Sequence, residues 1–292
     1  MYLYGYLLPG RLRRMLDSKR HALFGLAAAL ALVVACSSVA LVGAVPATAQ
    51  DLVQFLDLKS DDFTKADMSR ADIVAALAKL EPGKSLDLSG KRLNGLDLSG
   101  MDLRQTILRS ARLNGANLKD VKLDGVAFDQ AWALKSDFTN ASFIGATLFQ
   151  TQMMDAKIDG ANFSNAMVGA DMSRASLINA RFDDAMLAPD LTNQSMGLMR
   201  GVLKGANLEG ASFKGANLTR SAFEFASLKN VNFEGANLSG AELGGADLTG
   251  ANVTNANFDK ADVNSAKLLA LTGKASAKGF SSALNLDKAF VD

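Results

Sequence analysis

The chain has 292 residues, of which 49% are apolar and 21% charged, and its net charge at pH 7 is +1. This balance excludes an intrinsically disordered chain and a strongly basic one. The length alone would suggest two ordinary domains, but a short repeat dominates the sequence, and a solenoid escapes that estimate.

Residues 1–49 differ in kind from the rest and predict an exported protein. Basic residues between Arg11 and Arg20 precede an apolar run over residues 22–45, and Ala47-Thr48-Ala49 follows. A basic start, an apolar middle and an A-x-A exit are typical of a secretory signal peptide, here cleaved after Ala49. A start at Met15 would give a leader of more usual length, with residues 1–14 as an upstream extension. The mature protein is then expected in the periplasm or outside the cell.

Two other interpretations of the leader stay open. Val33-Val34-Ala35-Cys36 also fits a lipobox, which would place a lipid on Cys36 and make the protein an envelope lipoprotein. The apolar run is also long enough to span a bilayer as an uncleaved anchor. Contact with a membrane is expected only in these two cases.

Cleavage after Ala49 would remove the only histidine, His21, and the only cysteine, Cys36. The mature chain would then lack the imidazole and thiol groups that Ser-His-Asp and Cys-His nucleophile systems, His or Cys metal sites and disulfides require. We therefore predict that the protein is not an enzyme, with no catalytic residue, no metal and no cofactor.

Residues 50–83 are expected to cap the N-terminal end of the repeat array, with a short edge strand over 51–62. Ser69 followed by Asp72 resembles a capping box, apolar residues at helical spacing come next, and Pro82-Gly83 would end the helix. We predict one helix over about 70–80 that hides the exposed core and strand edge of the first coil. A helix that docks to another protein is the alternative.

From residue 84 to 268 a large apolar residue recurs every five positions. A small residue stands two places before it, Asn, Asp or Ser lies between them, and Gly is frequent two places after it. A period of five fits neither helix nor strand, but it fits stacked units that each have a short extended side and a corner. The predicted inward-facing centres include Leu88, Leu98, Leu118, Phe138, Phe143, Phe163, Leu203, Leu208, Phe213, Leu218, Phe223, Phe233, Leu238 and Phe258.

The A-[ND]-[LF]-x-x pattern, as in the copies ANLEG, ASFKG and ANLTR over residues 206–220, resembles that of the pentapeptide-repeat proteins. The resemblance implies an all-β fold, a right-handed quadrilateral β-helix with four repeats to a coil. Residues twenty apart would stack about 4.8 Å apart, as in any sheet ladder. Phe143 would then lie on Phe163, and Phe213 on Phe233, with ring centroids within about 4.5–7 Å. Outward residues such as Asn237 are expected to contribute little to stability unless they bridge a turn.

The frame loses one residue after Val168 and has an irregular break at about 188–200. The break is the best candidate for a projecting loop, and a tolerated slip is the alternative. Met196 and Met199, within the break, are candidate interaction residues, with flexible packing of an irregular region as the alternative.

Trp132 occupies the outward place beside Ala133, an unusually small repeat centre. It is a candidate interaction residue, either as an exposed aromatic anchor for a partner or, alternatively, as a side chain folded over a locally narrow coil.

The repeat pattern fades over residues 269–292, which are expected to form a C-terminal cap or tail. Phe280, Leu284, Leu286 and Phe290 could fold back as a second cap. The family resemblance also allows a homodimer through this end.

These observations predict a non-catalytic, exported β-helical scaffold or protein-interaction module whose protein partner the sequence does not identify. The alternative comes from the resemblance, since some pentapeptide-repeat proteins are DNA mimics that regulate topoisomerases. The leader holds five of the 31 basic and one of the 30 acidic residues, which leaves a net charge of −3. Mimicry needs a strongly acidic face, and export removes the chain from a cytoplasmic enzyme. Nucleic-acid binding is not expected either, because no basic stripe with interleaved aromatic residues is present.

Overall fold

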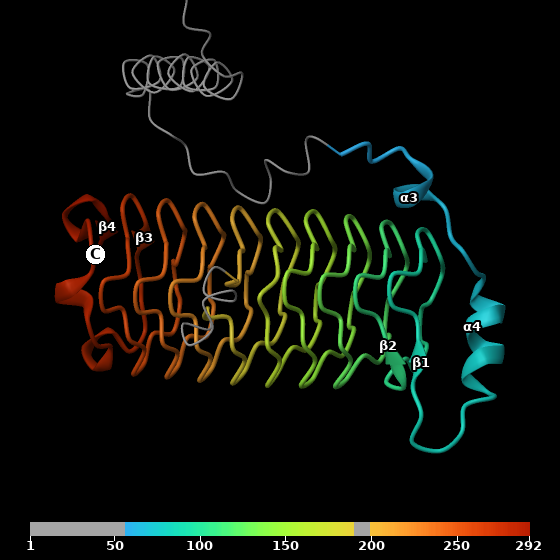
Figure 1. The fold of residues 1–292 in the computed structure, drawn as a ribbon. Helices are drawn as coiled ribbons and strands as arrows, with labels where there is room; N and C mark the ends of the chain where they lie inside the picture. Colours follow the sequence, from blue (N-terminus) through green and yellow to red (C-terminus); the bar gives the residue numbers. More distant parts are fainter. Residues whose placement is uncertain (1–55, 190–198) are drawn as a thin grey trace, which may run out of the picture. The chain divides into compact units, whose positions relative to one another are not determined.

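The computed structural model describes residues 56–189 and 199–292, and Asp57–Asp292 form one compact unit. In this unit the chain winds as a stack of coils, with the helix α4 (Arg70–Leu77) at one end and three short 3-10 helices at the other (Figure 1). The expected leader, residues 1–49, lies outside the described residues, and so does most of the break.

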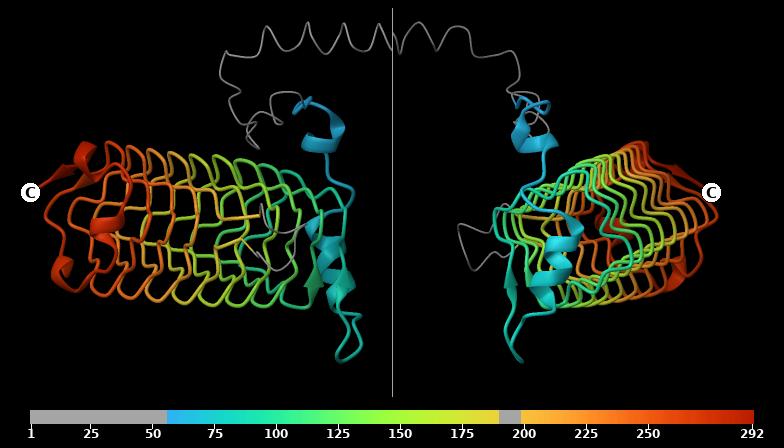
Figure 2. Two further views of the ribbon diagram at one scale, coloured as in Figure 1. Left: turned by 60° about the vertical axis from the view of Figure 1, so that its left-hand side comes forward. Right: turned by 90° about the vertical axis from the view of Figure 1, so that its right-hand side faces the viewer.

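Residues twenty apart pair in parallel along the array, for example Asp97 with Asn117 and Asn117 with Asp137. Four five-residue sides therefore complete one coil, and the coils superimpose when the stack is viewed along its length (Figure 2). Two-residue strands occur at the ends of the described array, where β1 (Leu86–Asp87) pairs with β2 (Thr106–Ile107) and β3 (Lys267–Leu268) with β4 (Phe290–Val291). Between them each side contributes a single bridge residue, which makes the unit a repeat β-helix solenoid.

The repeat around Phe233 shows how all five backbone N–H groups of a repeat can find acceptors. Around Phe233, three of them donate to carbonyls of the neighbouring coils and one closes the corner by donating from Ala236 to the Phe233 carbonyl. The fifth, on Glu234, donates to the side-chain oxygen of Asn232 at 3.1 Å. A buried or half-buried N–H without an acceptor is costly, so an Asn or Asp before the centre supplies the missing acceptor where it is present. The motif position between the small and the large residue thus has a backbone function.

Most corners are β-turns whose third residue has a positive φ. Gly205, Gly210 and Gly215 have φ of 63°, 70° and 68° there, and Asn140 and Asn230 have 58° and 56°. Glycine adopts this left-handed region without a steric penalty, and asparagine tolerates it better than most residues. At the glycine corners the structure therefore has the turn conformation that the sequence predicted.

All of the predicted repeat centres point into the coil, and none is more than 2% exposed. Phe143, Phe163, Phe182, Phe213 and Phe233 stack as one column, with successive centroid distances of 4.7, 4.7, 4.8 and 5.6 Å. The expected stacking of Phe143 on Phe163 and of Phe213 on Phe233 is confirmed. The small place two residues earlier is also buried, and where it is polar its hydroxyl donates to a carbonyl, as from Thr151 to Phe128 at 2.8 Å.

The coils on either side of the break remain paired with each other. Val202 pairs with Asp171, 31 residues earlier, which is eleven more than the usual twenty. The Gly201 N–H donates to the Leu187 carbonyl at 2.8 Å, so the residues on either side of the break are hydrogen-bonded to each other. The shorter coil after Val168 closes with nineteen residues instead of twenty.

At the N-terminal end α4 begins with a complete capping box, in which Ser69 and Asp72 each accept a hydrogen bond from the backbone of the other. Its Ile73 is fully buried and belongs to the same apolar core as the first repeat centres. The helix ends at Leu77, earlier than the expected residue 80. The edge strand expected over 51–62 lies partly outside the described residues. Its described part, from residue 56, forms a turn and then the start of a four-residue helix, α3 (Asp61–Thr64), whose first turn two acidic residues stabilise.

At the C-terminal end the chain forms one further coil whose sides have six residues instead of five. Thr272, Lys278, Leu284 and Phe290 pair in turn with the coil before them. The 3-10 helices η1 (Lys274–Ser276), η2 (Phe280–Ser282) and η3 (Leu286–Lys288) lengthen the corners by one residue each. This corrects the expectation of a fold-back cap: Phe280 and Leu286 pack against the core, whereas Leu284 and Phe290 lie in the outward place and are exposed.

We expect Phe233→Ala to lower the free energy of unfolding by roughly 3–5 kcal/mol, because the cavity would be walled by backbone ladders that cannot collapse. In a solenoid the damage should be local, so amide hydrogen exchange should rise first in the coils around residue 233 and later around Leu98. Lys157→Ala, at an exposed outward place, is the matched control and should leave exchange unchanged. A uniform loss of protection along the whole stack would contradict the repeat-by-repeat account of stability.

Candidate functional site

Outward side chains that stand one place before each centre stack into rows, because each pairs with its counterpart in the next coil. Two of these rows have an unusual composition. The arginine–tryptophan row begins with Arg92, Arg112 and Trp132. The methionine–asparagine row consists of Ile107, Ala127, Thr147, Met167, Met186, Asn217, Asn237 and Asn257.

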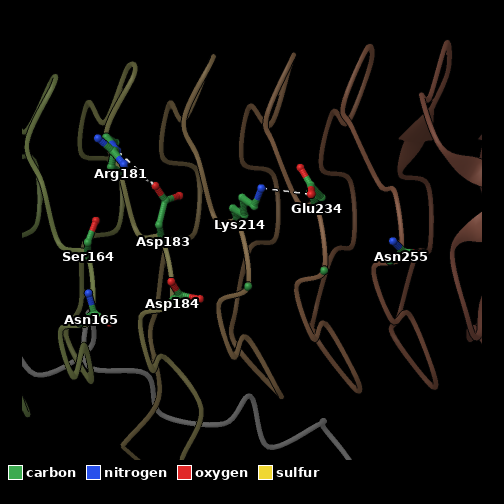
Figure 3. Close-up of a pocket in the computed structure, with 10 residues that line it drawn as sticks. Ser164, Asn165, Arg181, Asp183, Asp184, Lys214, Glu234 and Asn255 are labelled. Atoms are coloured by element: carbon green, nitrogen blue, oxygen red, sulfur yellow. Dashed lines mark hydrogen bonds and ion pairs between the residues drawn. The ribbon is translucent and has the colours of Figure 1, made fainter.

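A shallow depression of about 460 Å³ lies along one corner of the coils (Figure 3). Arg181 Nη2 lies 2.7 Å from Asp183 Oδ2, and Lys214 Nζ lies 3.1 Å from Glu234 Oε1. Burial alone would raise the pKa of Asp183, but hydrogen bonds from the Ser212 hydroxyl and from Arg181 outweigh this and keep the pKa below its usual value. Lys214 and Glu234 thus link adjacent coils, whereas Arg181 pairs with Asp183 within one coil. Because both basic groups already have acidic partners, we assign the depression no chemical role.

Within residues 56–189 and 199–292, no group of three His, Cys, Asp or Glu side chains is placed to hold a metal ion. The helices in the same part of the chain are too short, or too polar, to cross a membrane.

The first half of the methionine–asparagine row is apolar and open to solvent. Met167 and Met186 are 44% and 43% exposed, and Ile144, at the corner that precedes Thr147, is 41% exposed. Met167 and Met186 pair in adjacent coils, and side chains so paired lie about 4.8 Å apart, so the two methionines form one apolar patch. Ile144 is an exposed apolar residue at a corner of the coil before them. Thioether side chains adapt to irregular surfaces, which suits a patch that binds another protein.

The second half of the same row is satisfied by its own hydrogen bonds. Asn237 Oδ1 accepts from the Ser239 N–H at 3.2 Å and from its hydroxyl at 2.6 Å, and Asn237 Nδ2 donates to Thr219 Oγ1 at 3.1 Å. Asn257 Nδ2 donates to Asn237 Oδ1 at 3.3 Å. Asn237 thus bridges a turn and links adjacent coils, which is the exception that the sequence prediction allowed.

Trp132 is half-buried, but its own coil does not cover it. Its ring contacts that of Phe63 in α3, with centroids 5.5 Å apart and an interplanar angle of 80°. The N-terminal segment of the chain therefore covers this part of the arginine–tryptophan row.

Met199 is half-buried beside Gly169 and Phe149. A Cβ at Gly169 would lie 3.1 Å from Phe149 Cδ1 and 3.7 Å from Met199 Cβ, so the glycine leaves room for this contact. Met199 and Trp132 belong to different contacts, and Met196 lies outside the described residues.

Phe225 is a residue that the sequence prediction did not single out. It stands at a corner with a φ of 60°, and 78% of its surface is exposed. A bulky residue at positive φ is strained, and strain persists where the surrounding structure or a function maintains it. Its position two places after the centre Phe223, where glycine is usual, was the available signal.

The comparisons with known proteins agree with this architecture. The model of the family described as pentapeptide repeats matches eight copies, over residues 87–125, 136–168, 202–235 and 236–268. The chain belongs to the pentapeptide-repeat family.

Three solved structures illustrate the similarity. HetL, a pentapeptide-repeat protein involved in heterocyst differentiation regulation in the cyanobacterium Nostoc sp. strain PCC 7120, is 24% identical, with a TM-score of 0.26 over 76% of this chain and 94% of HetL. The full-length plasmid-mediated fluoroquinolone resistance protein QnrB1 is 14% identical, with a TM-score of 0.30 over 72% and 92%. A pentapeptide-repeat protein of the Arabidopsis thaliana thylakoid lumen is 22% identical, with a TM-score of 0.23 over 42% and 65%. These similarities carry no argument about function, and no curated protein matches the chain.

We expect Asn237→Ala to lower the free energy of unfolding by about 1–2 kcal/mol, because it removes the acceptor of the Ser239 N–H and the link to Thr219. Chemical denaturation monitored by circular dichroism measures this change. Lys157→Ala, in an outward place of another row, should change it by less than about 0.5 kcal/mol. Equal effects from the two substitutions would show that the asparagine hydrogen bonds do not stabilise the coil.

Proposed function

We propose that the protein is a non-catalytic interaction scaffold that binds a protein partner through the apolar half of the methionine–asparagine row. The observation that carries the proposal is the contrast within that row. In one half of the row the asparagine side chains hydrogen-bond to one another and to neighbouring hydroxyls. In the other half Met167 and Met186, with Ile144 at a nearby corner, are apolar and exposed. An exposed apolar patch on an otherwise polar surface is typical of a protein-binding site.

The rigidity of the stack suits this function. A ladder of backbone hydrogen bonds fixes each outward side chain relative to the next coil, so a partner meets a preorganised surface and little conformational entropy is lost on binding. We also propose that the coils wind in the right-handed sense that the family resemblance implies, and that the protein catalyses no reaction.

A DNA-mimic regulator of topoisomerases is the less favoured function. A mimic needs a continuous acidic face to imitate a line of phosphates. Here acidic side chains alternate with basic partners along the coils, as in Lys204 with Glu224 at 2.7 Å and Lys119 with Asp137 at 3.3 Å. We propose no nucleic-acid partner for the same reason.

Export is a second part of the proposal and rests on the sequence of residues 1–49 alone. Cleavage after Ala49 would place the scaffold in the periplasm or outside the cell, where its partner would also be found. Lipidation at Cys36 would instead hold it on the envelope as a lipoprotein.

A photo-crosslinking experiment tests the binding surface. Benzoylphenylalanine in place of Ile144 should give a discrete adduct in an envelope extract of the producing cells, and the double substitution Met167→Glu and Met186→Glu should abolish that adduct. The same label in place of Lys157, on another side of the coil, is the control and should give none. Identical adducts from both labelled positions, or an adduct unaffected by the glutamates, would refute the assignment of the surface.

N-terminal sequencing of the protein recovered from the periplasm or medium tests the export proposal. We expect the first residue to be Gln50, because Ala47-Thr48-Ala49 precedes it. A lipid-modified terminus at Cys36 would favour the lipoprotein, and an intact Met15 would contradict cleavage.

A further inference from the structure

The first three residues of the arginine–tryptophan row bear a segment of the same chain, residues 61–67. This segment lies on the surface of the coil and is not part of the core: Phe63 is half-buried, and its other six residues are exposed. The helix α3 within it contains no buried residue. The Asn94 amide, itself only 4% exposed, donates to the Asp62 and Lys65 carbonyls at 3.1 and 2.9 Å, so the segment docks through polar contacts.

Charge complementarity holds the segment. Arg112 Nη1 lies 2.7 Å from the Asp62 carboxylate, and Arg92 Nη2 lies 2.6 Å from the Asp67 carboxylate. The hydrogen bond from Arg112 lowers the pKa of Asp62, and that from Arg92 lowers the pKa of Asp67, so both groups are ionised at neutral pH. Two arginines of the row thus recognise two acidic side chains five positions apart.

Phe63, which follows Asp62 in the sequence, makes an aromatic contact with the third residue of the row. The Phe63 ring meets the Trp132 ring edge-on at 5.5 Å, and the Arg112 guanidinium carbon lies 5.5 Å from the centre of the Phe63 ring. Arg112 therefore contacts both the carboxylate of Asp62 and the ring that follows it. Cation–π and edge-to-face contacts give this site a geometric preference for an aromatic side chain next to an acid.

Backbone pairing completes the recognition. Ala66 pairs with Leu93 in the antiparallel sense, whereas the coils pair with one another in parallel. The Asp67 N–H donates to the Arg92 carbonyl at 2.7 Å, and the Arg92 N–H donates to Asp67 Oδ2 at 2.9 Å. Addition of an extended segment to the free edge of the first coil is a known mode of peptide recognition.

From these contacts we propose that Arg92, Arg112 and Trp132 form a docking surface for an acidic peptide segment of a partner protein, with the sequence Asp-Phe followed by Asp four residues later. Residues 61–67 occupy the surface as an internal ligand that such a segment displaces. The inference rests on the proposed scaffold function, but it concerns a different row of the coil.

The internal ligand sets the conditions for binding. A short tether gives a covalently attached segment an effective concentration on the order of millimolar. A partner segment must therefore exceed that competition, or bind when residues 61–67 have left the row. Weakening the internal ligand should accordingly strengthen the binding of an external peptide.

Trp132 is the only tryptophan of the chain, and its fluorescence reports on the surface directly. We would titrate a peptide of residues 58–68, which lacks tryptophan, into the full-length protein carrying Asp62→Asn and Phe63→Ala. We expect a saturable change in Trp132 emission, with a midpoint at least tenfold lower than in the unsubstituted protein. A scrambled peptide of the same composition is the control for net charge.

Adding Arg112→Ala to the same variant should raise the midpoint at least tenfold, because both the ion pair and the ring contact are lost. If Trp132 emission shows no saturable change in the protein carrying Asp62→Asn and Phe63→Ala, the proposal is overturned. So does loss of amide protection throughout the coils of that variant, which would show that residues 61–67 are a structural cap. Light scattering that reveals a dimer with exchanged segments would identify a second copy as the occupant instead. The crosslinking result at position 144 is independent of all these outcomes, so a failure here leaves the scaffold proposal standing.

Discussion

The structure depends on one constraint, the in-register hydrogen bonding of each coil to the next. The backbone N–H groups of a coil donate mainly to carbonyls of the coils before and after it, because most of them have no acceptor within their own coil. In the repeat around Phe233, the remaining N–H, that of Glu234, donates to the side chain of Asn232. This requirement fixes the repeat length, places the large residue inside and leaves only the outward places free to vary. Function is therefore confined to rows of outward side chains, the corners and the interruptions.

The sequence predicted those features that repeat and missed those that occur once. The period of five identified the buried centres, and the positive φ at corners such as Gly210 follows from the same pattern. The covering of Trp132 by Phe63 could not be predicted, because it joins residues 69 positions apart through a segment outside the repeat. The final coil was missed because its period is six, although Ala277, Ala283 and Ala289 recur at that spacing. The sequence predicted that Asn237 would contribute little to stability unless it bridged a turn, and the structure shows that it does so.

The phenylalanine column shows why the array tolerates interruptions. It runs without a gap from Phe143 to Phe233, through both the nineteen-residue coil and the coils joined by the break at 188–200. The rings lie on a side of the coil away from both irregularities, so an insertion at one corner leaves the packing of the opposite side unchanged. Such corners are places where a rigid stack can acquire new surface without losing its core.

The six-residue sides of the last coil have a consequence for assembly. The bridge residues of this coil pair with the five-residue sides of the coil before it, because the 3-10 helices take up the extra residue at each corner. A second molecule that added head to tail could pair its own five-residue sides with this coil in the same way. Heterologous addition of that kind leads to filaments, and an open β-helix end is a template for it. The change of period therefore does not by itself protect this end of the stack, and the exposed Leu284 and Phe290 stand in the outward places of the coil that would accept a second molecule.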